Sequence, residues 1–258
     1  MSEFLYGYDA GKDMPAEFLT SHAAWDDFIS GIWAAVLSDT TFDESTSVLE
    51  VGPGVSTKIG GALAKIGFCG ELYVVDPLEG VLDVLKSKYK ALLPNAKVTY
   101  ISKSLSDAYA DLPLDVDLIL GSHVLDDVMI YHGAASALDW AKEYTHQPSM
   151  YLKTSWQSIL EDTDKLSLIK KSVIEDILDM YERLKPEAMI LNQYPSATLN
   201  DHDMESLNLH AFDILRKLAE RLAGEDIQNV LNTFPHYKNK HIGAHVLNAK
   251  YWLLCKKK

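Results

Sequence analysis

Residues with ligand-binding chemistry stand close together in the segment 48–57. Glu50 closes a short apolar run, and Gly52 and Gly54 follow it in the sequence Leu-Glu-Val-Gly-Pro-Gly. Glycines at a turn from a strand into a helix permit backbone angles that other residues rarely adopt, and they let the main chain approach a ligand closely. The first amide groups of the following helix remain free to donate hydrogen bonds. The segment therefore predicts a cradle for a nucleotide or a nucleotide-like cofactor.

The acid at position 50 and the residue at position 57 argue against a dinucleotide in this cradle. The dinucleotide fingerprint needs a third glycine where this chain has Thr57, and it does not require an acid such as Glu50 before the glycines. A carboxylate repels a pyrophosphate but attracts a cationic amino-acid group. S-adenosylmethionine joins such a group to a nucleoside, so it is the cofactor that these residues favour.

A second acid, Asp76, ends the next apolar run, 72–75, and is followed by Pro77. In doubly wound proteins, an acid at this distance after the glycine turn accepts hydrogen bonds from the hydroxyls of the cofactor ribose. The alternative for Asp76 is a purely structural N-cap of the next helix. Its place at the tip of the second predicted strand favours ribose binding.

Apolar runs alternate with helical patterns along the middle of the chain. After the second run, Val81, Leu82 and Leu85 recur at the spacing of one helical stripe. Strands that alternate with helices predict a doubly wound, mostly parallel α/β sheet of the Rossmann-like kind, with helices on both faces. The expected strands are 46–51, 72–75, 97–101, 116–120 and 150–153.

The flanking segments are expected to join this sheet in a single domain, 1–258. Residues 1–40 read as a helical cap or lid that carries four aromatic residues, and 41–154 form the cofactor-binding half. A helical insertion, 155–203, is expected after the fifth strand, with a helix at 162–184 and a polar connector from 191. Residues 204–258 are expected to supply a helix at 206–222 and two strand candidates, 230–234 and 250–255, that could pair antiparallel at a sheet edge. The aromatic residues of the cap are Tyr6, Tyr8, Trp25 and Trp33.

Composition narrows the choice of partners. The formal net charge of −13 disfavours nucleic acids, because affinity for them rests on lysine and arginine displacing counterions. A small or cationic substrate suits this charge better. The sequence contains no apolar run of membrane-spanning length and no signal peptide pattern, so a soluble, cytoplasmic protein is expected. Only Cys69 and Cys255 are present, without metal-ligand spacing, and the late histidines His236, His241 and His245 lack a cysteine or carboxylate partner, so no metal site is expected.

With these motifs in this order, the sequence resembles the class I S-adenosylmethionine-dependent methyltransferases, the seven-stranded Rossmann-like family. The first motif of the resemblance is 49–54, the second is 74–77, and the similarity extends from Ser47 to the C-terminus. It implies that Glu50, Gly52 and Gly54 line the methionine moiety, that Asp76 holds the ribose, and that Pro77 and Leu78 flank the adenine. The residues expected to bind the cofactor are Glu50, Gly52, Pro53, Gly54, Asp76, Pro77, Leu78, Ser104, Leu105, Gly121 and Ser122.

The third and fourth motifs of the resemblance are less regular. Where the family often has an acid facing the adenine amine, this chain has Ser104 and Leu105, and Asp107 could take the role with a shifted register. The fourth motif, 121–127, implies the place where the substrate meets the sulfonium. There His123 is a candidate general base, because its ordinary pKa near 6.5 suits proton transfer, with a structural hydrogen-bonded histidine as the alternative. Asp126 and Asp127 also fit the acidic first turn of a helix.

The resulting prediction is S-adenosylmethionine-dependent methyl transfer to a small-molecule acceptor, with S-adenosylhomocysteine as the product. Direct displacement at the sulfonium methyl needs chiefly in-line positioning, for which effective molarities of roughly 10⁵ to 10⁸ M are attainable, so a general base is optional. Two alternatives remain open. The same cofactor could donate its aminopropyl or aminobutyl part, or the chain could be a catalytically silent regulatory subunit. The sequence does not fix the acceptor or the oligomeric state.

Overall fold

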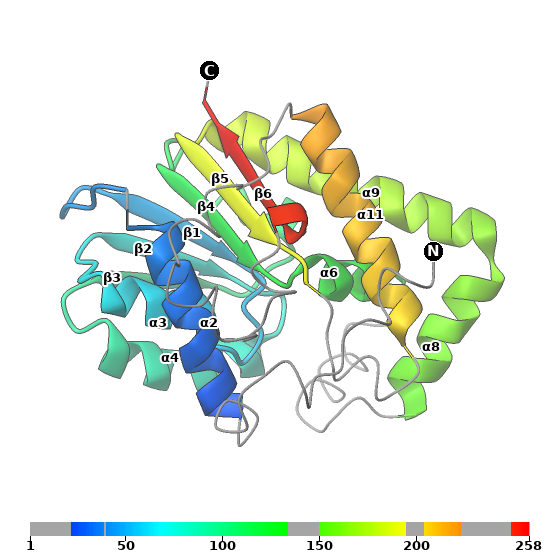
Figure 1. The fold of residues 1–258 in the computed structure, drawn as a ribbon, viewed down its shortest axis with the longest axis horizontal. Helices are drawn as coiled ribbons and strands as arrows, with labels where there is room; N and C mark the ends of the chain where they lie inside the picture. Colours follow the sequence, from blue (N-terminus) through cyan, green and yellow to red (C-terminus); the bar gives the residue numbers. More distant parts are fainter. Residues whose placement is uncertain (1–21, 39, 134–149, 195–203, 223–248, 258) are drawn as a thin grey trace.

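The computed structural model describes residues 22–38, 40–133, 150–194, 204–222 and 249–257. They form a six-stranded sheet in the order β3-β2-β1-β4-β5-β6 (Figure 1). All neighbouring strands run parallel except β6, which pairs antiparallel with β5 at the edge. The predicted doubly wound α/β class with an antiparallel edge strand is therefore confirmed. The strands are β1 (Ser47–Val51), β2 (Glu71–Val75), β3 (Lys97–Ile101), β4 (Leu118–Ser122), β5 (Ala188–Asn192) and β6 (Trp252–Lys256).

Helices connect and flank these strands (Figure 1). Helix α9 ends as predicted before a proline, since Lys185 adopts a left-handed backbone conformation with φ of 45° and Pro186 follows. The helices are α2 (His22–Val36), α3 (Lys58–Lys65), α4 (Glu79–Leu92), α5 (Leu105–Ala108), α6 (Leu125–Gly133), α8 (Met150–Glu161), α9 (Thr163–Leu184) and α11 (Glu205–Arg221), with a 3₁₀ turn at Ala249–Tyr251.

The fifth strand lies elsewhere than the sequence pattern predicts. The segment 150–153 begins helix α8, whose Trp156 and Ile159 are buried three residues apart on one helical face. The true fifth strand, β5, includes the start of the segment that reads as a polar connector. Helices α8 and α9 therefore lie between the fourth and fifth strands, and not after the fifth.

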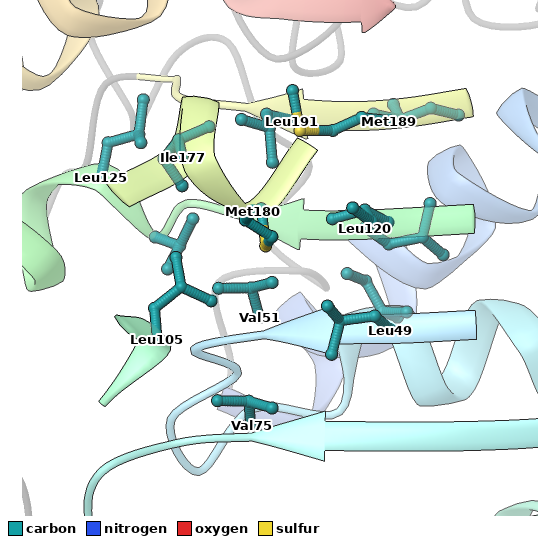
Figure 2. Packing of buried hydrophobic residues seen from close by; sticks show 14 of the residues in the cluster. Leu49, Val51, Val75, Leu105, Leu120, Leu125, Ile177, Met180, Met189 and Leu191 are labelled. Atoms are coloured by element: carbon teal, nitrogen blue, oxygen red, sulfur yellow. The ribbon is translucent and has the colours of Figure 1, made fainter. Parts of the chain in front are cut away.

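The two faces of the sheet carry different side chains because successive residues of a strand point to opposite sides. Figure 2 shows Leu49 and Val51 of β1 on the same face as Ile177 and Met180 of α9. Glu50, which lies between Leu49 and Val51, faces the opposite side of the sheet. This alternation places Glu50 toward the helices α3 and α4, where its hydroxyl partner lies.

The N-terminal helix and the C-terminal strand meet through two tryptophans. The rings of Trp33 in α2 and Trp252 in β6 lie 4.8 Å apart between centroids, and both side chains are fully buried. The predicted C-terminal strand at 250–255 is confirmed, and its observed antiparallel partner is β5. The second strand candidate, 230–234, lies outside the described residues, as do Tyr6, Tyr8 and the late histidines.

None of the helices in the described parts of the chain combines the length and apolarity needed to cross a bilayer. Within the same parts, no group of three histidine, cysteine or acidic side chains is arranged to hold a metal ion.

Candidate functional site

The turn between β1 and α3 requires glycine at two positions. Gly52 and Gly54 have φ angles of 55° and 58°, a region that residues with a Cβ rarely adopt. A Cβ at Gly52 would also lie 2.4 Å from Cγ2 of Val124, which follows β4. The turn is fixed to β2 by a hydrogen bond of 2.8 Å from the Gly52 amide to the Val75 carbonyl. The main chain at Gly52 thus lies beside the carboxyl ends of the central strands, where no side chain larger than that of glycine fits.

Asp76 connects this turn to the next one. Its carboxylate accepts a hydrogen bond of 3.2 Å from the Gly54 amide and one of 2.9 Å from the Leu78 amide. Burial raises the pKa of Asp76 to about 6, while these two backbone hydrogen bonds act in the opposite direction. The structure therefore brings the two predicted motifs together at one carboxylate.

A cavity opens beside Asp76 where the order of the strands reverses. It lies at the carboxyl ends of β1, β2 and β4, the position where open α/β sheets bind ligands. Its walls combine apolar side chains with three carboxylates from β2, α6 and α9. The lining residues are Val51, Gly52, Val75, Asp76, Pro77, Leu78, Ser104, Leu105, Ser106, Val124, Asp127, Val128, Tyr131, His132 and Asp176.

Six of the residues predicted to bind a cofactor line this cavity, and five do not. The positions of these residues do not test whether they bind a cofactor, so their binding roles stay predictions. The lining residues of this set are Gly52, Asp76, Pro77, Leu78, Ser104 and Leu105, and the others are Glu50, Pro53, Gly54, Gly121 and Ser122.

Glu50 lies on the other face of the sheet, buried against α4. The Tyr89 hydroxyl lies 3.0 and 2.8 Å from its two carboxylate oxygens. Burial raises the pKa of Glu50 to about 8, and the hydrogen bond from Tyr89 only partly offsets this. A Cβ at Gly60 of α3 would lie 2.5 Å from the Tyr89 ring, so this glycine makes room for the tyrosine. At neutral pH the Glu50 carboxyl therefore favours its protonated form.

The start of helix α3 is held from outside by helix α2. Thr57, the N-cap of α3, makes no capping bond with its own side chain. Instead, Asp26 of α2 accepts hydrogen bonds from the Thr57 amide, at 2.8 Å, and from the Ser56 hydroxyl, at 2.9 Å. An acid at this position also suits the positive end of the helix dipole. The predicted cap segment thus contributes a side chain that fixes the end of the glycine turn.

The imidazole of His123 is held by acceptors on both sides. Its Nε2 lies 2.7 Å from the Tyr194 carbonyl, and its Nδ1 lies 3.2 Å from a carboxylate oxygen of Asp126. His123 also has a φ of 58°, and its amide donates to the carbonyl and side chain of Asn192. A histidine nitrogen can take a proton from a substrate only when it is free of such a contact, so a base role for His123 requires one contact to open.

Asp126 and Gln193 complete a buried polar network between the ends of β4 and β5. The Gln193 amide donates to Asp126 at 3.0 Å, and its carbonyl oxygen accepts from the Leu125 amide at 3.0 Å. Burial opposes ionisation of Asp126, but His123 and then Gln193 bring its pKa below the ordinary value. Asp126 and Asp127 occupy the acidic first turn of α6, as their alternative interpretation expects.

Lys58 and Tyr194 lie together near this network. The Lys58 ammonium lies 5.9 Å from the centroid of the Tyr194 ring, and the Trp25 ring packs edge-on against Tyr194 at 6.0 Å. Burial disfavours the charge on Lys58, but Tyr194, Asp26 and Asp127 together raise its pKa above the ordinary value. This lysine therefore stays charged.

In the third motif, Ser104 and Asp107 form hydrogen bonds that cap the start of helix α5. The Asp107 amide donates to the Ser104 hydroxyl at 3.3 Å, and that hydroxyl donates to the Asp107 carboxylate at 2.6 Å. Asp107 is exposed and is not among the residues that line the cavity. The role of Asp107 toward an adenine amine stays a prediction, and two other acids, Asp127 of α6 and Asp176 of α9, line the cavity.

In the fourth motif, Gly121 and Ser122 pack within the molecule. A Cβ at Gly121 would lie 2.7 Å from the Leu191 side chain, and the Ser122 hydroxyl accepts a hydrogen bond of 3.1 Å from the Trp33 indole. Trp33 is therefore a core residue, while Trp25 lies partly buried beside Tyr194.

The sequence interpretation missed the site residues that come from late elements. Asp176 and Gln193 belong to α9 and to the end of β5, and no local motif marks either one. Two polar residues, Asn192 and Gln193, directly follow the apolar part of β5, and such a change from apolar to polar residues is typical of a strand end. That signal is readable only once 188–192 is recognised as a strand.

No protein-family model and no curated protein matches the sequence. Several solved structures match the fold, among them methyltransferases. The CcbJ methyltransferase from Streptomyces caelestis matches with 17% identity and a TM-score of 0.36, over 64% of this chain and 49% of that chain. An O-methyltransferase family protein from Burkholderia thailandensis matches with 14% identity and a TM-score of 0.44, over 90% and 57%. Mycolic acid cyclopropane synthase CmaA1, solved with SAH and CTAB, matches with 10% identity and a TM-score of 0.41, over 90% and 83%.

This chain spans about half the length of the first two of these structures. With identities of 10 to 17% and TM-scores of 0.36 to 0.44, these structures do not identify corresponding functional residues. The chemistry of the site is therefore argued from its own geometry.

Proposed function

We propose that this protein binds S-adenosylmethionine in the cavity beside Asp76 and transfers its methyl group to a small-molecule acceptor. The observation that carries the proposal is the charge of the cavity. Asp76, Asp127 and Asp176 line it, and among the described lining residues the only side chain that can carry positive charge is His132. Three carboxylates disfavour the pyrophosphate of a dinucleotide and favour a cofactor without phosphate groups whose charged end includes a cation.

The residues that line the cavity suit the nucleoside part of this cofactor. Asp76, which lines the cavity, would accept hydrogen bonds from the ribose hydroxyls, and Gly52, which has no Cβ, would allow a close approach of the ligand to the main chain. The adenine would lie between apolar side chains that follow β2, β3 and β4 in the sequence. These apolar side chains are Leu78, Leu105, Val124 and Val128.

Glu50 would act on the cofactor from beneath the turn. Its carboxyl lies behind β1 and does not face the cavity, so direct contact with the methionine moiety requires rearrangement. A cation near the turn favours ionisation of Glu50, because the charged forms attract each other across a buried region. We therefore propose that Glu50 contributes electrostatic attraction and that it loses its proton when the cofactor binds.

The bound cofactor supplies an electrophilic methyl group on a sulfonium. The nucleophilic atom of the acceptor forms a bond to the methyl carbon while the carbon–sulfur bond breaks, and the electron pair stays on sulfur. Any proton that the acceptor loses passes to solvent or to a base, for which His123 remains the predicted candidate. We propose that Trp25 and Tyr194 are the aromatic neighbours of the acceptor.

Calorimetry with purified protein tests the proposal. We expect saturable binding of S-adenosylhomocysteine and S-adenosylmethionine and no binding of NAD. Asp76→Asn should weaken this binding at least about tenfold, because charged hydrogen bonds contribute roughly 1.5–3 kcal/mol each. Asp83→Asn is the matched control, since Asp83 lies on the exposed face of α4 and pairs only with Lys86 among the described residues.

Binding of NAD, or equal affinity in the Asp76 variant, would contradict the proposed cofactor site. Turnover is tested separately with a panel of hydroxyl, amine and carbon acceptors and mass spectrometry of the products. A gain of one methyl group supports the proposal, whereas a larger gain identifies aminopropyl or aminobutyl transfer. Binding without any product across the panel favours a silent regulatory subunit.

A further inference from the structure

A second cavity lies between helices α9 and α11, and its charge is opposite to that of the whole chain. It measures about 320 Å³, within the range of roughly 300–1,000 Å³ that is typical of ligand pockets. Four cationic side chains line it together with one carboxylate, although the chain carries a net charge of −13. The lining residues are Thr163, Leu166, Ser167, Lys170, Lys171, Ile174, Glu175, Lys217 and Arg221. We refer to this cavity as the α9–α11 groove.

Ion pairs across the groove hold some of these cations in place. Lys170 of α9 pairs with Asp213 of α11, and only 15% of the Lys170 side chain is exposed. Lys217 pairs with the same carboxylate at 3.1 Å, and Arg221 pairs with Glu175 at 3.5 Å. Two carboxylates thus face four cations, so positive charge is in excess.

The pKa of His210 in α11 is also affected by the cations of the groove. Burial lowers the pKa of His210, and Lys170 is the next cause in the same direction. Lys217 lowers this pKa further, whereas Asp213 raises it. Burial is thus the first cause of this shift, and the two lysines that add to it both line the groove.

Helix association explains only part of this arrangement. The ion pairs of Lys170 and Arg221 join α9 to α11. Lys217 pairs with Asp213, the partner of Lys170. Lys171 lines the groove as well, but among the described residues it forms no ion pair. The hydroxyls of Thr163 and Ser167 on the same helical face add uncharged donors. The groove therefore contains more hydrogen-bond donors than carboxylate acceptors.

We propose that the α9–α11 groove binds a small anion that carries phosphate groups. Lysine supplies mobile charged donors, and arginine offers the planar fork that pairs with two phosphate oxygens. The groove exceeds the space that a single ion needs, so a diphosphate or a phosphorylated metabolite fits better than an isolated phosphate. This site is separate from the cavity beside Asp76, and the proposal does not depend on the cofactor.

Helix α9 is the wall that the two cavities share. Glu175 lines the groove, while the next residue, Asp176, lines the cofactor cavity and accepts a contact of 2.9 Å from His132. An anion that attracts Arg221 competes with the Glu175 ion pair, and so acts on the same helical turn that carries Asp176. Occupancy of the groove is therefore expected to change cofactor affinity.

Calorimetric titration with inorganic pyrophosphate tests the groove directly. We expect saturable binding at physiological ionic strength in the unmodified protein. Lys171→Ala should weaken it about tenfold, because it removes a charged donor that forms no ion pair with any residue in the described parts of the chain. Glu175→Gln should strengthen it severalfold, because it removes a competing carboxylate and frees Arg221. Lys90→Ala is the matched control, an exposed helical lysine on α4 that lies outside the groove.

Thermal unfolding of each variant shows whether the fold is retained. The proposal is overturned if pyrophosphate gives no saturable heat, or if Lys171→Ala binds it as tightly as Lys90→Ala does. It is also overturned if Glu175→Gln weakens binding, or if an acidic peptide such as polyglutamate binds in the groove while pyrophosphate does not.

Discussion

Glu50 has the sequence position of a ligand-binding acid and the surroundings of a core residue. Only 2% of it is exposed, and the hydroxyl of Tyr89 lies against both carboxylate oxygens. Position in the motif could be predicted from Leu49–Gly54 alone. The burial of Glu50 could not be predicted, because Tyr89 belongs to the helix that follows the next strand. No residue near Glu50 in the sequence indicates that this tyrosine contacts it.

The raised pKa of Glu50 makes stability depend on pH. The folded protein keeps this proton up to about pH 8, whereas the unfolded chain releases it near pH 4.5. Folding stability due to this group is therefore highest below about pH 4.5 and declines as pH rises toward 8. Glu50→Gln should remove this decline, which between pH 6 and pH 8.5 amounts to about 2.5 kcal/mol for a shift from 4.5 to about 8, since one pKa unit corresponds to about 1.4 kcal/mol.

Urea unfolding at pH 6 and pH 8.5 measures this difference. Glu182→Gln, an exposed substitution in α9, should keep the pH dependence of the unmodified protein. A Glu50→Gln variant that declines in parallel with the unmodified protein would show that the carboxyl is already ionised when folded.

At the scale of elements, helix α2 supports the glycine turn through one side chain. Asp26 reaches Ser56 and Thr57 at the start of α3, whereas its neighbour Asp27 pairs with the exposed ammonium of Lys65 at 2.7 Å. The two acids stand side by side in the sequence but have different partners. Composition and spacing cannot distinguish them, because the distinction depends on how α2 packs against α3.

Alanine substitution separates these two roles. Asp26→Ala should lower the unfolding free energy by about 1–2 kcal/mol, as loss of a helix N-cap does. Asp27→Ala should cost less than about 0.5 kcal/mol, because its ion pair is exposed. Chemical denaturation measures both values, and equal effects for the two variants would contradict the assigned role of Asp26.

The strands adjoining the glycine turn were predictable from sequence, and β5 was not. The strands β1 to β4 are short apolar runs that end in turn-forming or polar residues, so pattern and structure agree. The run at 150–153 has the same apolar character, but Trp156 and Ile159 continue it at helical spacing. Short apolar runs are ambiguous between strand and helix, and here tertiary packing decides the outcome.

At the scale of the whole molecule, the two ends of the described fold are joined by the buried pair Trp33 and Trp252. Helix α2 packs on α3, and β6 closes the edge of the sheet beside β5. The cavity beside Asp76 depends on this closure indirectly, since Trp33 also donates to Ser122 at the end of β4, one of the strands whose ends border it. A substitution in β6 that disturbs this packing should therefore also disturb the end of β4 beside the cavity.

Trp252→Ala should lower the unfolding free energy by about 3–5 kcal/mol, the usual cost of removing a buried tryptophan. Leu114→Ala should change it by less than about 0.5 kcal/mol, because Leu114 is 82% exposed. Calorimetric or urea unfolding gives both numbers. A small effect of Trp252→Ala would mean that α2 and β6 do not support each other.

The position of β6 in the chain also affects how the protein emerges during synthesis. Residues 193–251 must be made after β5 before the strand that covers its open side exists. Until the ribosome has released Trp252–Lys256 from its exit tunnel, β5 offers an unpaired backbone edge to other nascent chains, and such edges promote association. Chaperones that shield exposed strands are therefore expected to matter more for the yield of this protein before β6 has been made than afterwards.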